Sequence, residues 1–391
     1  MKRLLVLSIF SVLTIACQIK NEHKEPPLTI GAALFQNYLP LLKNKNIALI
    51  VNQTSMVGNT HLVDTLLSKG INIVKIFAPE HGFRGSADAG EHVEDGVDVK
   101  TNIPIVSLYG DHKKPTEDDL ATIDIVIFDI QDVGVRFYTY ISTMHLAMEA
   151  CAEQNKKFIV LDRPNPNGHY IAGPILDMNY KSFVGMHPIP IVHGLTIGEF
   201  ALMINEEEWL TDKAHCDLNV VKMMGYTHNT RYELPVKPSP NLPNKRSIDL
   251  YPSLCLLEPT VMSIGRGTPF PFQVVGYPDS TYGNFSFKPV SIIGASKYPK
   301  HENESCYGED LREMPTNTKF SISWLIKYYQ EYSDSSFFTS KSFFDKLAGN
   351  SILREQLQHG LSQMEIEESW EIELEKYALL RKKHLLYPDF N

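Results

Sequence analysis

Short runs of apolar, mostly β-branched residues alternate with amphipathic stretches through the first half of the chain. Such runs are typical of buried strands in a parallel sheet, because helices cover both faces of that sheet. The first amphipathic stretch has Thr60 and Gly70 where helices start and end. The alternation predicts parallel βαβ units with right-handed crossovers. The predicted strands are 46–51, 73–78, 103–108, 125–129, 158–161 and 218–223, and the predicted helices are 61–69, 116–121, 141–154 and 197–209.

The pattern changes at residues 234–243, which contain four prolines. This composition indicates either a domain linker or a loop lying across a cleft. Loops rich in proline and glycine follow, and helices are predicted at 323–331, 342–347, 352–358 and 365–381. We therefore expect an α/β protein with a parallel-sheet domain over residues 30–235 and a smaller α+β domain over residues 236–391.

The first residues have the pattern of an export signal. Two basic residues precede an apolar stretch over residues 4–15, which is shorter than the ~20 residues of a membrane span. The end of this stretch resembles a bacterial lipobox, with Thr14 where leucine is usual. We expect residues 1–17 to be a signal peptide, Cys17 to be lipidated, and residues 18–29 to be a tether. The alternative is an ordinary signal peptide with an incidental cysteine. The predicted location is periplasmic, with membrane contact only through this lipid.

Composition and motifs exclude some partners and cofactors. The formal charge of −9 argues against a nucleic-acid partner, which favours a basic surface. No G-x-G-x-x-G motif follows the first predicted strand, so no dinucleotide cofactor is expected. The histidines lack the spacing of a zinc site, and we expect no metal. The alternative is a divalent metal held by Glu80, His81, Glu91 or His92.

Three predicted strands are each followed by a cluster of polar residues. In an open α/β sheet, ligands bind outside the carboxyl ends of the strands. Carboxylates and arginines gathered there are not needed by a core, so the clusters predict an active site. The cluster after strand 73–78 contains Glu80, His81, Arg84 and Glu91. The cluster at the end of strand 125–129 contains Asp129, Asp132, Arg136, Tyr138 and Tyr140, and the cluster after strand 158–161 contains Asp162, Arg163 and Asn165.

The first cluster offers the best candidate for a general acid. A carboxylate at the end of a buried strand, as predicted for Glu80, is a natural place for a raised pKa. The alternative is a loop carboxylate that caps the next element. Glu91 follows in the same loop and is either a second catalytic candidate or a solvated surface residue. Tyr138 and Tyr140 either stack on a sugar ring or belong to the core.

The other two clusters have equally plain structural alternatives. Asp129 and Asp132 are catalytic candidates, but an Asx-type turn with a salt bridge to Arg136 explains them too. Asp162 and Arg163 lie in a proline-stiffened turn that suits a ligand contact or a structural ion pair. In the second half of the chain, Glu258 and Arg266 also stand out. Arg266 lies between two glycines, which suits either carboxylate or phosphate binding or a plain turn.

These motifs resemble the NamZ-type exo-β-N-acetylmuramidases, a bacterial family long known only as a domain of unknown function. The similarity covers nearly the whole chain after about residue 30. It is carried by the stretches 78–85, 89–91, 128–140, 161–166, 265–268 and 381–387.

The resemblance implies that the larger domain is Rossmann-like and that the active site lies in the cleft between it and the smaller domain. It also implies hydrolytic release of N-acetylmuramic acid from the non-reducing end of peptidoglycan fragments. It implies that a glutamate of the first motif is catalytic, with Glu80 the first choice and Glu91 the second. One carboxylic acid would protonate the leaving oxygen. A second carboxylate (Asp129 and Asp132 are the candidates), a water or the substrate's acetamido group would attack the anomeric carbon.

The lactyl carboxylate of muramic acid requires a cation, and Arg84, Arg136, Arg163 and Arg266 are the candidates. His81, Tyr138, Tyr140, Asp162 and Asn165 complete the expected substrate-binding set.

Two rival functions remain at this point. An exported two-lobed protein with a lipid anchor also fits a periplasmic solute-binding lipoprotein. A metal-dependent phosphoester or amide hydrolase could use the aspartates instead. Release of free sugar from a muramyl-glucosamine disaccharide distinguishes the first rival, and loss of activity with a chelator identifies the second.

Overall fold

The computed structural model describes residues 26–80, 82–83, 95–314, 319–332 and 334–390. The candidate residues Cys17, His81, Arg84, Glu91 and His92 lie outside these ranges.

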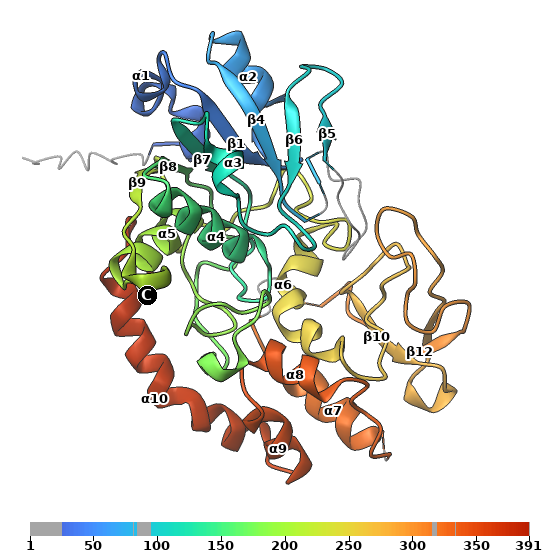
Figure 1. Ribbon diagram of the computed structural model, residues 1–391. Helices are drawn as coiled ribbons and strands as arrows, with labels where there is room; N and C mark the ends of the chain where they lie inside the picture. The colour runs from blue at the N-terminus through green and yellow to red at the C-terminus, as the bar shows by residue number, and fades with distance from the viewer. Residues whose placement is uncertain (1–25, 81, 84–94, 315–318, 333, 391) are drawn as a thin grey trace, which may run out of the picture.

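The larger part of the fold is built on a seven-stranded sheet (Figure 1). Its strand order is β5-β6-β4-β1-β7-β8-β9, in which neighbours are parallel except that β5 runs antiparallel to β6. Without β5, this is the doubly wound order typical of Rossmann-like domains. The strands are β1 Ile47–Val51, β4 Ile73–Ala78, β5 Gly96–Val97, β6 Pro104–Ser107, β7 Ile125–Asp129, β8 Lys157–Leu161 and β9 Asp217–Val221. The predicted fold class is confirmed.

Helices cover both faces of this sheet (Figure 1). Alternate side chains of β1 enter different cores: Leu49 packs with residues of α1 and α2, whereas Ile50 packs with residues of α4 and α5. This alternation follows from the two-residue period of a strand. The helices are α1 Leu39–Leu42, α2 Leu62–Ser68, α3 Glu117–Leu120, α4 Tyr140–Glu153 and α5 Ile197–Glu206.

The start of α2 differs from the sequence prediction. Thr60 does not cap this helix, because it pairs in a two-stranded hairpin of β2 (Met56–Val57) and β3 (Thr60–His61). His61 is the N-cap instead, and its Nδ1 accepts from the backbone N–H of Val63 at 3.3 Å. The ring of a histidine thus replaces the expected hydroxyl.

The smaller domain contains a three-stranded antiparallel sheet of order β10-β12-β11, packed with helices (Figure 1). The sequence analysis predicted helices α7, α8 and α9 but not α6 or the three strands. Pro252 inside α6 and the glycines and prolines around the strands obscured both periodicities. The elements are α6 Lys245–Leu254, β10 Val274–Tyr277, β11 Phe285–Phe287, β12 Cys306–Asp310, α7 Ser323–Glu331, α8 Lys341–Ala348 and α9 Ile352–Gln358.

The last helix, α10 (Gln363–Lys382), leads the chain back to the larger domain (Figure 1). Its residue Tyr377 donates from its hydroxyl to the carbonyl of His193 at 2.7 Å. After the helix, the Tyr387 hydroxyl donates to Asp162 Oδ2 at 2.6 Å. The C-terminal segment therefore fastens the smaller domain to the loops at the carboxyl edge of the main sheet. Across the described ranges, no helix combines the length and the apolar character that a bilayer span demands.

Candidate active site

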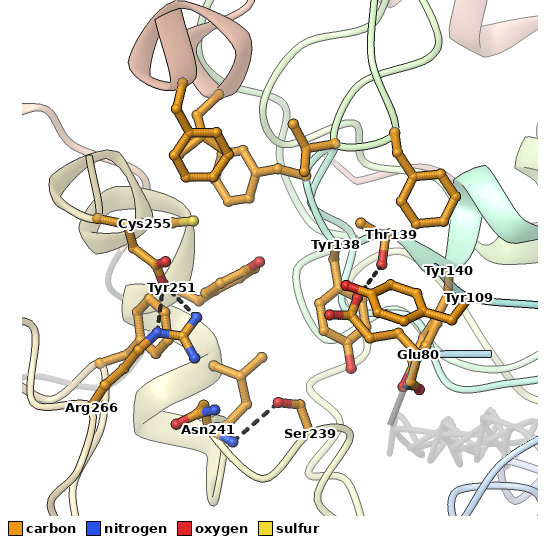
Figure 2. A pocket seen from close by; sticks show the side chains of 18 residues that line it. Glu80, Tyr109, Tyr138, Thr139, Tyr140, Ser239, Asn241, Tyr251, Cys255 and Arg266 are labelled. Carbon is orange, nitrogen blue, oxygen red and sulfur yellow. Dashed lines mark hydrogen bonds and ion pairs between the residues drawn. The ribbon is translucent and has the colours of Figure 1, made fainter. Parts of the chain in front are cut away.

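A cavity of about 430 Å³ lies where the carboxyl edge of the main sheet meets the smaller domain. Three strand ends of the larger domain contribute to it: Glu80 follows β4, Tyr109 follows β6, and Thr139 comes between β7 and α4. Glu258 and Arg266 of the smaller domain line the same cavity. Figure 2 shows Glu80, Tyr109 and Thr139 on one side of an open space and Arg266 on the other. Hydroxyl-bearing and charged side chains from distant parts of the chain are thus brought together.

Hydroxyl groups surround Glu80 on its wall. Thr139 Oγ1 donates to Glu80 Oε2 at 2.8 Å, and the Tyr140 hydroxyl lies 3.4 Å from the Glu80 backbone carbonyl oxygen. The Tyr109 phenol is also hydrogen-bonded to the Glu80 carboxylate, and burial together with this negative charge raises the pKa of the phenol. These contacts fix the direction of the Glu80 side chain.

Tyr138 and Tyr140 are buried in the cavity wall. Their rings meet edge to face at a centroid distance of 4.9 Å, and burial raises the pKa of both phenols. The Tyr138 hydroxyl donates to the carbonyl of Pro238 at 2.8 Å, and Gln53 Nε2 donates to the same oxygen at 3.0 Å. The two phenols therefore combine the predicted alternatives, because they are core residues that also line the cavity.

Those contacts hold the proline-rich segment across the cleft. Ser239 and Asn241 of this segment line the cavity (Figure 2), and Ser239 Oγ accepts from the backbone N–H of Asn241 at 3.1 Å. Residues 234–243 therefore form a loop across the cleft, which is one of the two predicted alternatives.

The opposite wall carries an ion pair. Arg266 Nε and Nη2 both donate to Glu258 Oε1, at 2.9 and 2.5 Å. The Arg266 guanidinium also lies over the ring of Phe272, 5.1 Å from its centroid. Burial opposes the charge of Arg266, but the negative charge of Glu258 raises its pKa overall. The neighbouring Gly267 has φ +80°, and a Cβ there would lie 2.6 Å from the carbonyl oxygen of Val290, so glycine is required.

A second cation lies behind this pair. Lys300 Nζ donates to the backbone carbonyls of Glu258, Thr260 and Met262, so all three ammonium hydrogens have acceptors. Burial lowers the pKa of Lys300 to about 8, an effect that the charge of Glu258 partly offsets. Glu258, Arg266 and Lys300 together carry one positive charge at neutral pH. This wall therefore favours an anionic group.

Asp129 does not reach the cavity, because it forms an ion pair with Arg163. Arg163 Nε donates to Asp129 Oδ1 at 2.6 Å and Arg163 Nη2 to Oδ2 at 2.9 Å, and both side chains are buried. The same Nη2 donates to the carbonyl of Met56 at 3.1 Å. The predicted salt-bridge partner of Asp129, Arg136, is not the one that the structure shows. The pair joins the ends of β7 and β8 beneath the site.

Arg136 is buried away from the cavity lining. Its two terminal nitrogens donate to four backbone carbonyls, at 2.7–2.9 Å. Two of these carbonyls belong to Leu347 and Ala348 of α8 and the others to Pro174 and Ile189 of the larger domain. Burial lowers the pKa of Arg136 to about 9. Its contacts are those of a residue that joins the two domains.

The remaining predicted residues support neighbouring loops. Asp132 Oδ2 accepts from the backbone N–H of Gly134 at 2.6 Å, and Asn165 Nδ2 donates to the carbonyl of Leu195 at 2.7 Å. Asp162 accepts from the Gly198 backbone N–H at 2.8 Å, besides its contact with Tyr387. Burial raises the pKa of Asp162 to about 7. None of Asp132, Asp162 and Asn165 is among the described residues that line the cavity.

Several cavity residues had no signal in the sequence. Tyr109 and Thr139 approach Glu80 only because the segments after their strands lie at one edge of the sheet. Lys300, which lies behind the cavity wall, reaches Glu258 across a long loop. In the described part of the chain, no three His, Cys, Asp or Glu side chains are grouped so that they could hold a metal ion.

Comparison with known proteins gives a consistent result. Family models for the N-terminal and C-terminal parts of exo-β-N-acetylmuramidase NamZ match residues 47–246 and 249–387. The chain is 41% identical to the peptidoglycan β-N-acetylmuramidase NamZ of Bacillus subtilis (strain 168), over 97% of each chain. Two crystal structures of DUF1343 family proteins from Bacteroides fragilis NCTC 9343 are also similar. One is 47% identical, with a TM-score of 0.86 over 93% of this chain and 100% of that one. The other is 31% identical, with a TM-score of 0.81 over 92% and 99%.

Proposed function

Because this chain belongs to the family of NamZ exo-β-N-acetylmuramidases, we propose that it is a glycoside hydrolase that releases N-acetylmuramic acid from the non-reducing end of peptidoglycan fragments. One structural observation supports this activity most directly. Glu80, fixed by hydroxyl groups, faces the positively charged wall of Arg266 across one cavity. A carboxyl group for proton transfer and a cation for a carboxylate are what an anionic sugar acetal requires.

Glu80 is the proposed proton donor to the glycosidic oxygen. Its position at the end of β4 places it in the cavity lining, and the bond from Thr139 Oγ1 orients its carboxyl group there. Glu91 keeps its place as the second candidate, since it lies outside the described residues. Glu258 is the other carboxylate among the described lining residues, and its ion pair with Arg266 suits it to charge compensation.

Arg266 is the proposed ligand for the lactyl carboxylate. Arg136 and Arg163 are held by carbonyls and by Asp129, respectively, whereas Arg266 lines the cavity. The Arg266–Glu258 pair is held through Nε and Nη2 of the guanidinium, and not through Nη1. A bound carboxylate would accept a hydrogen bond from Nη1, and its negative charge would neutralise the positive charge of the wall. N-acetylglucosamine lacks the lactyl group and would be bound less tightly.

The test is hydrolysis of a muramyl-glucosamine disaccharide by the purified protein, with free N-acetylmuramic acid as the product. Release of the sugar supports the proposal, whereas binding without release would identify a solute-binding protein. Activity that a chelator abolishes would favour the metal-dependent hydrolase. A disaccharide that begins with N-acetylglucosamine is the matched control, and equal turnover of the two would contradict the lactyl contact.

We also propose that the protein is exported to the periplasm and anchored by a lipid on Cys17. The support is the apolar stretch and lipobox-like end of residues 1–17, followed by a polar tether. A Cys17→Ser variant should leave the membrane fraction and incorporate no labelled fatty acid. Fractionation unchanged by this substitution would overturn the anchor without affecting the proposed activity.

A further inference from the structure

The loop between β11 and β12 presents large apolar side chains to solvent. Ile293 is 90% exposed and Tyr298 is 81% exposed. So exposed a tyrosine is unusual in a loop that is otherwise held in place. Lys297 lies over one face, with Nζ 5.5 Å from the Tyr298 ring centroid. The other face of the ring is free to meet a ligand.

Several contacts fix this loop against the wall of the cavity. Asn241, which lines the cavity, donates from Nδ2 to the carbonyl of Ala295 at 2.7 Å. The backbone N–H of Val290 donates to the carbonyl of Gly267, next to Arg266, at 2.9 Å. Lys300, at the end of the loop, donates to the backbone that carries Glu258. The loop is therefore attached to both the proline-rich segment and the charged wall.

These attachments limit how far Tyr298 can lie from the cavity. Tyr298 is three residues from Ala295 and two from Lys300. A fully extended chain spans at most about 3.5 Å per residue, so the Tyr298 backbone is within about 11 Å of the backbone bonded to Asn241. The loop that carries Tyr298 is thus attached to a residue of the cavity wall.

The size of the cavity limits how much of a glycan it can hold. A volume of about 430 Å³ is near the lower end for pockets that hold small ligands. It suits one terminal sugar, and the rest of a glycan chain would then lie outside. Pyranose rings have apolar C–H faces, and a tyrosine offers a flat contact surface at a low cost in side-chain entropy.

We propose that Tyr298 and Lys297 form a second binding site, for the part of the glycan beyond the sugar next to the scissile bond. Tyr298 stacks on a pyranose ring, and Lys297 pairs with a lactyl or peptide carboxylate of the same chain. This inference rests on the proposed function. It predicts that longer fragments are better substrates than the disaccharide, and that this preference depends on Tyr298.

The test compares kcat/KM for the muramyl-glucosamine disaccharide and for the tetrasaccharide with two such units. Tyr298→Ala should lower kcat/KM for the tetrasaccharide about five-fold, as expected from losing roughly 40 Å² of apolar contact, and leave the disaccharide unchanged. Tyr298→Trp should restore the preference, because it restores a flat ring. The matched control is Ile372→Ala on α10, which removes a side chain that is 67% exposed and should change neither substrate.

Equal effects of Tyr298→Ala on both substrates, or no effect on either, would overturn the second site. A change in oligomeric state by sedimentation with unchanged kinetics would also overturn it, and would assign the patch to contact between copies of the chain. If the wild type hydrolyses neither sugar, the proposed function fails by itself. Calorimetric binding of the tetrasaccharide to wild type and Tyr298→Ala then decides the second site separately.

Discussion

The two walls of the cavity are built on different principles. The wall of the larger domain comes from three strand ends of one rigid sheet, and its hydroxyl groups converge on Glu80. The wall of the smaller domain combines residues of helices α6 and α8 with loops. Its polar side chains are organised by charge: Glu258 binds Arg266, and Lys300 lies behind them. The first wall fixes the direction of a single carboxylate, whereas the second maintains a net charge.

This difference suggests a division of labour. Proton transfer depends on position at the scale of a hydrogen bond, and a parallel sheet supplies that precision. Recognition of a carboxylate depends on charge and on donors that can adjust to it. Substitutions in the first wall should therefore change kcat, and substitutions in the second wall should change KM. Each of the following experiments could break this separation.

The largest effect is expected for Glu80→Gln. The amide keeps the shape but cannot donate an acidic proton, so kcat should fall about a hundred- to ten-thousand-fold, with the thermal midpoint nearly unchanged. Release of N-acetylmuramic acid from the disaccharide measures this loss. Glu375→Gln, on the exposed face of α10, is the control. A Glu80→Gln enzyme that keeps a tenth of wild-type kcat would transfer the role to Glu91.

Arg136→Ala should act on stability, although the sequence placed this residue among the substrate ligands. The substitution removes the side-chain donors of four buried carbonyl groups. The Ile189 carbonyl keeps the backbone N–H of Leu176 at 3.1 Å, and the loss of the other contacts should lower the free energy of unfolding by about 4 kcal/mol. Urea denaturation measures the shift, and KM of the folded variant should stay within about two-fold of wild type. A raised KM with normal stability would contradict the structural role.

Arg266→Ala should raise KM for muramyl substrates by about ten- to a hundred-fold, the usual contribution of a hydrogen-bonded ion pair, and change kcat little. Arg312 provides a close control, because it is bound to Asp310 and lies 4.6 Å from the ring centroid of Phe270, but does not line the cavity. Arg312→Ala should therefore leave KM unchanged. An unaltered KM in Arg266→Ala would remove the arginine from substrate binding.

The first wall was the more predictable of the two. Apolar runs gave the strands, and the rule that ligands bind at carboxyl ends placed Glu80 in the site. The same rule failed to separate functional carboxylates from structural ones. Asp129 and Asp162 also lie at the ends of strands, but Asp129 forms an ion pair with Arg163 and Asp162 accepts a hydrogen bond from Tyr387. Those partners come from other elements, and in the case of Tyr387 from the far end of the chain, so local sequence could not identify them.

The second wall left much weaker signals. Arg266 stands out in the sequence because it lies between two glycines. Its contact with Phe272 and the bond from Lys300 to the backbone of Glu258 depend on how loops without periodicity fold back. The short strands β10, β11 and β12 were missed for the same reason. Loop-built sites are specified by hydrogen bonds between distant backbone groups, as Lys300 illustrates, and such bonds have no repeating pattern in a sequence.

The smallest expected effect concerns pH and tests whether charge alone operates the second wall. Burial lowers the pKa of Lys300 to about 8 from 10.5, so the ammonium loses its proton in the folded protein as pH rises through 8, while the unfolded chain keeps it. The net charge of the wall then falls from one to zero, and KM for a muramyl substrate should rise about three-fold between pH 7 and pH 9. The free-energy cost of burying the charged ammonium also disappears in this window, so Lys300 destabilises the fold less as pH rises.

Lys300→Arg, which stays charged, should keep KM constant to pH 9, with kcat following the wild-type profile. If Lys300→Arg shows the same rise in KM as wild type, the titrating group lies elsewhere, and the second wall recognises its ligand by geometry as the first one does.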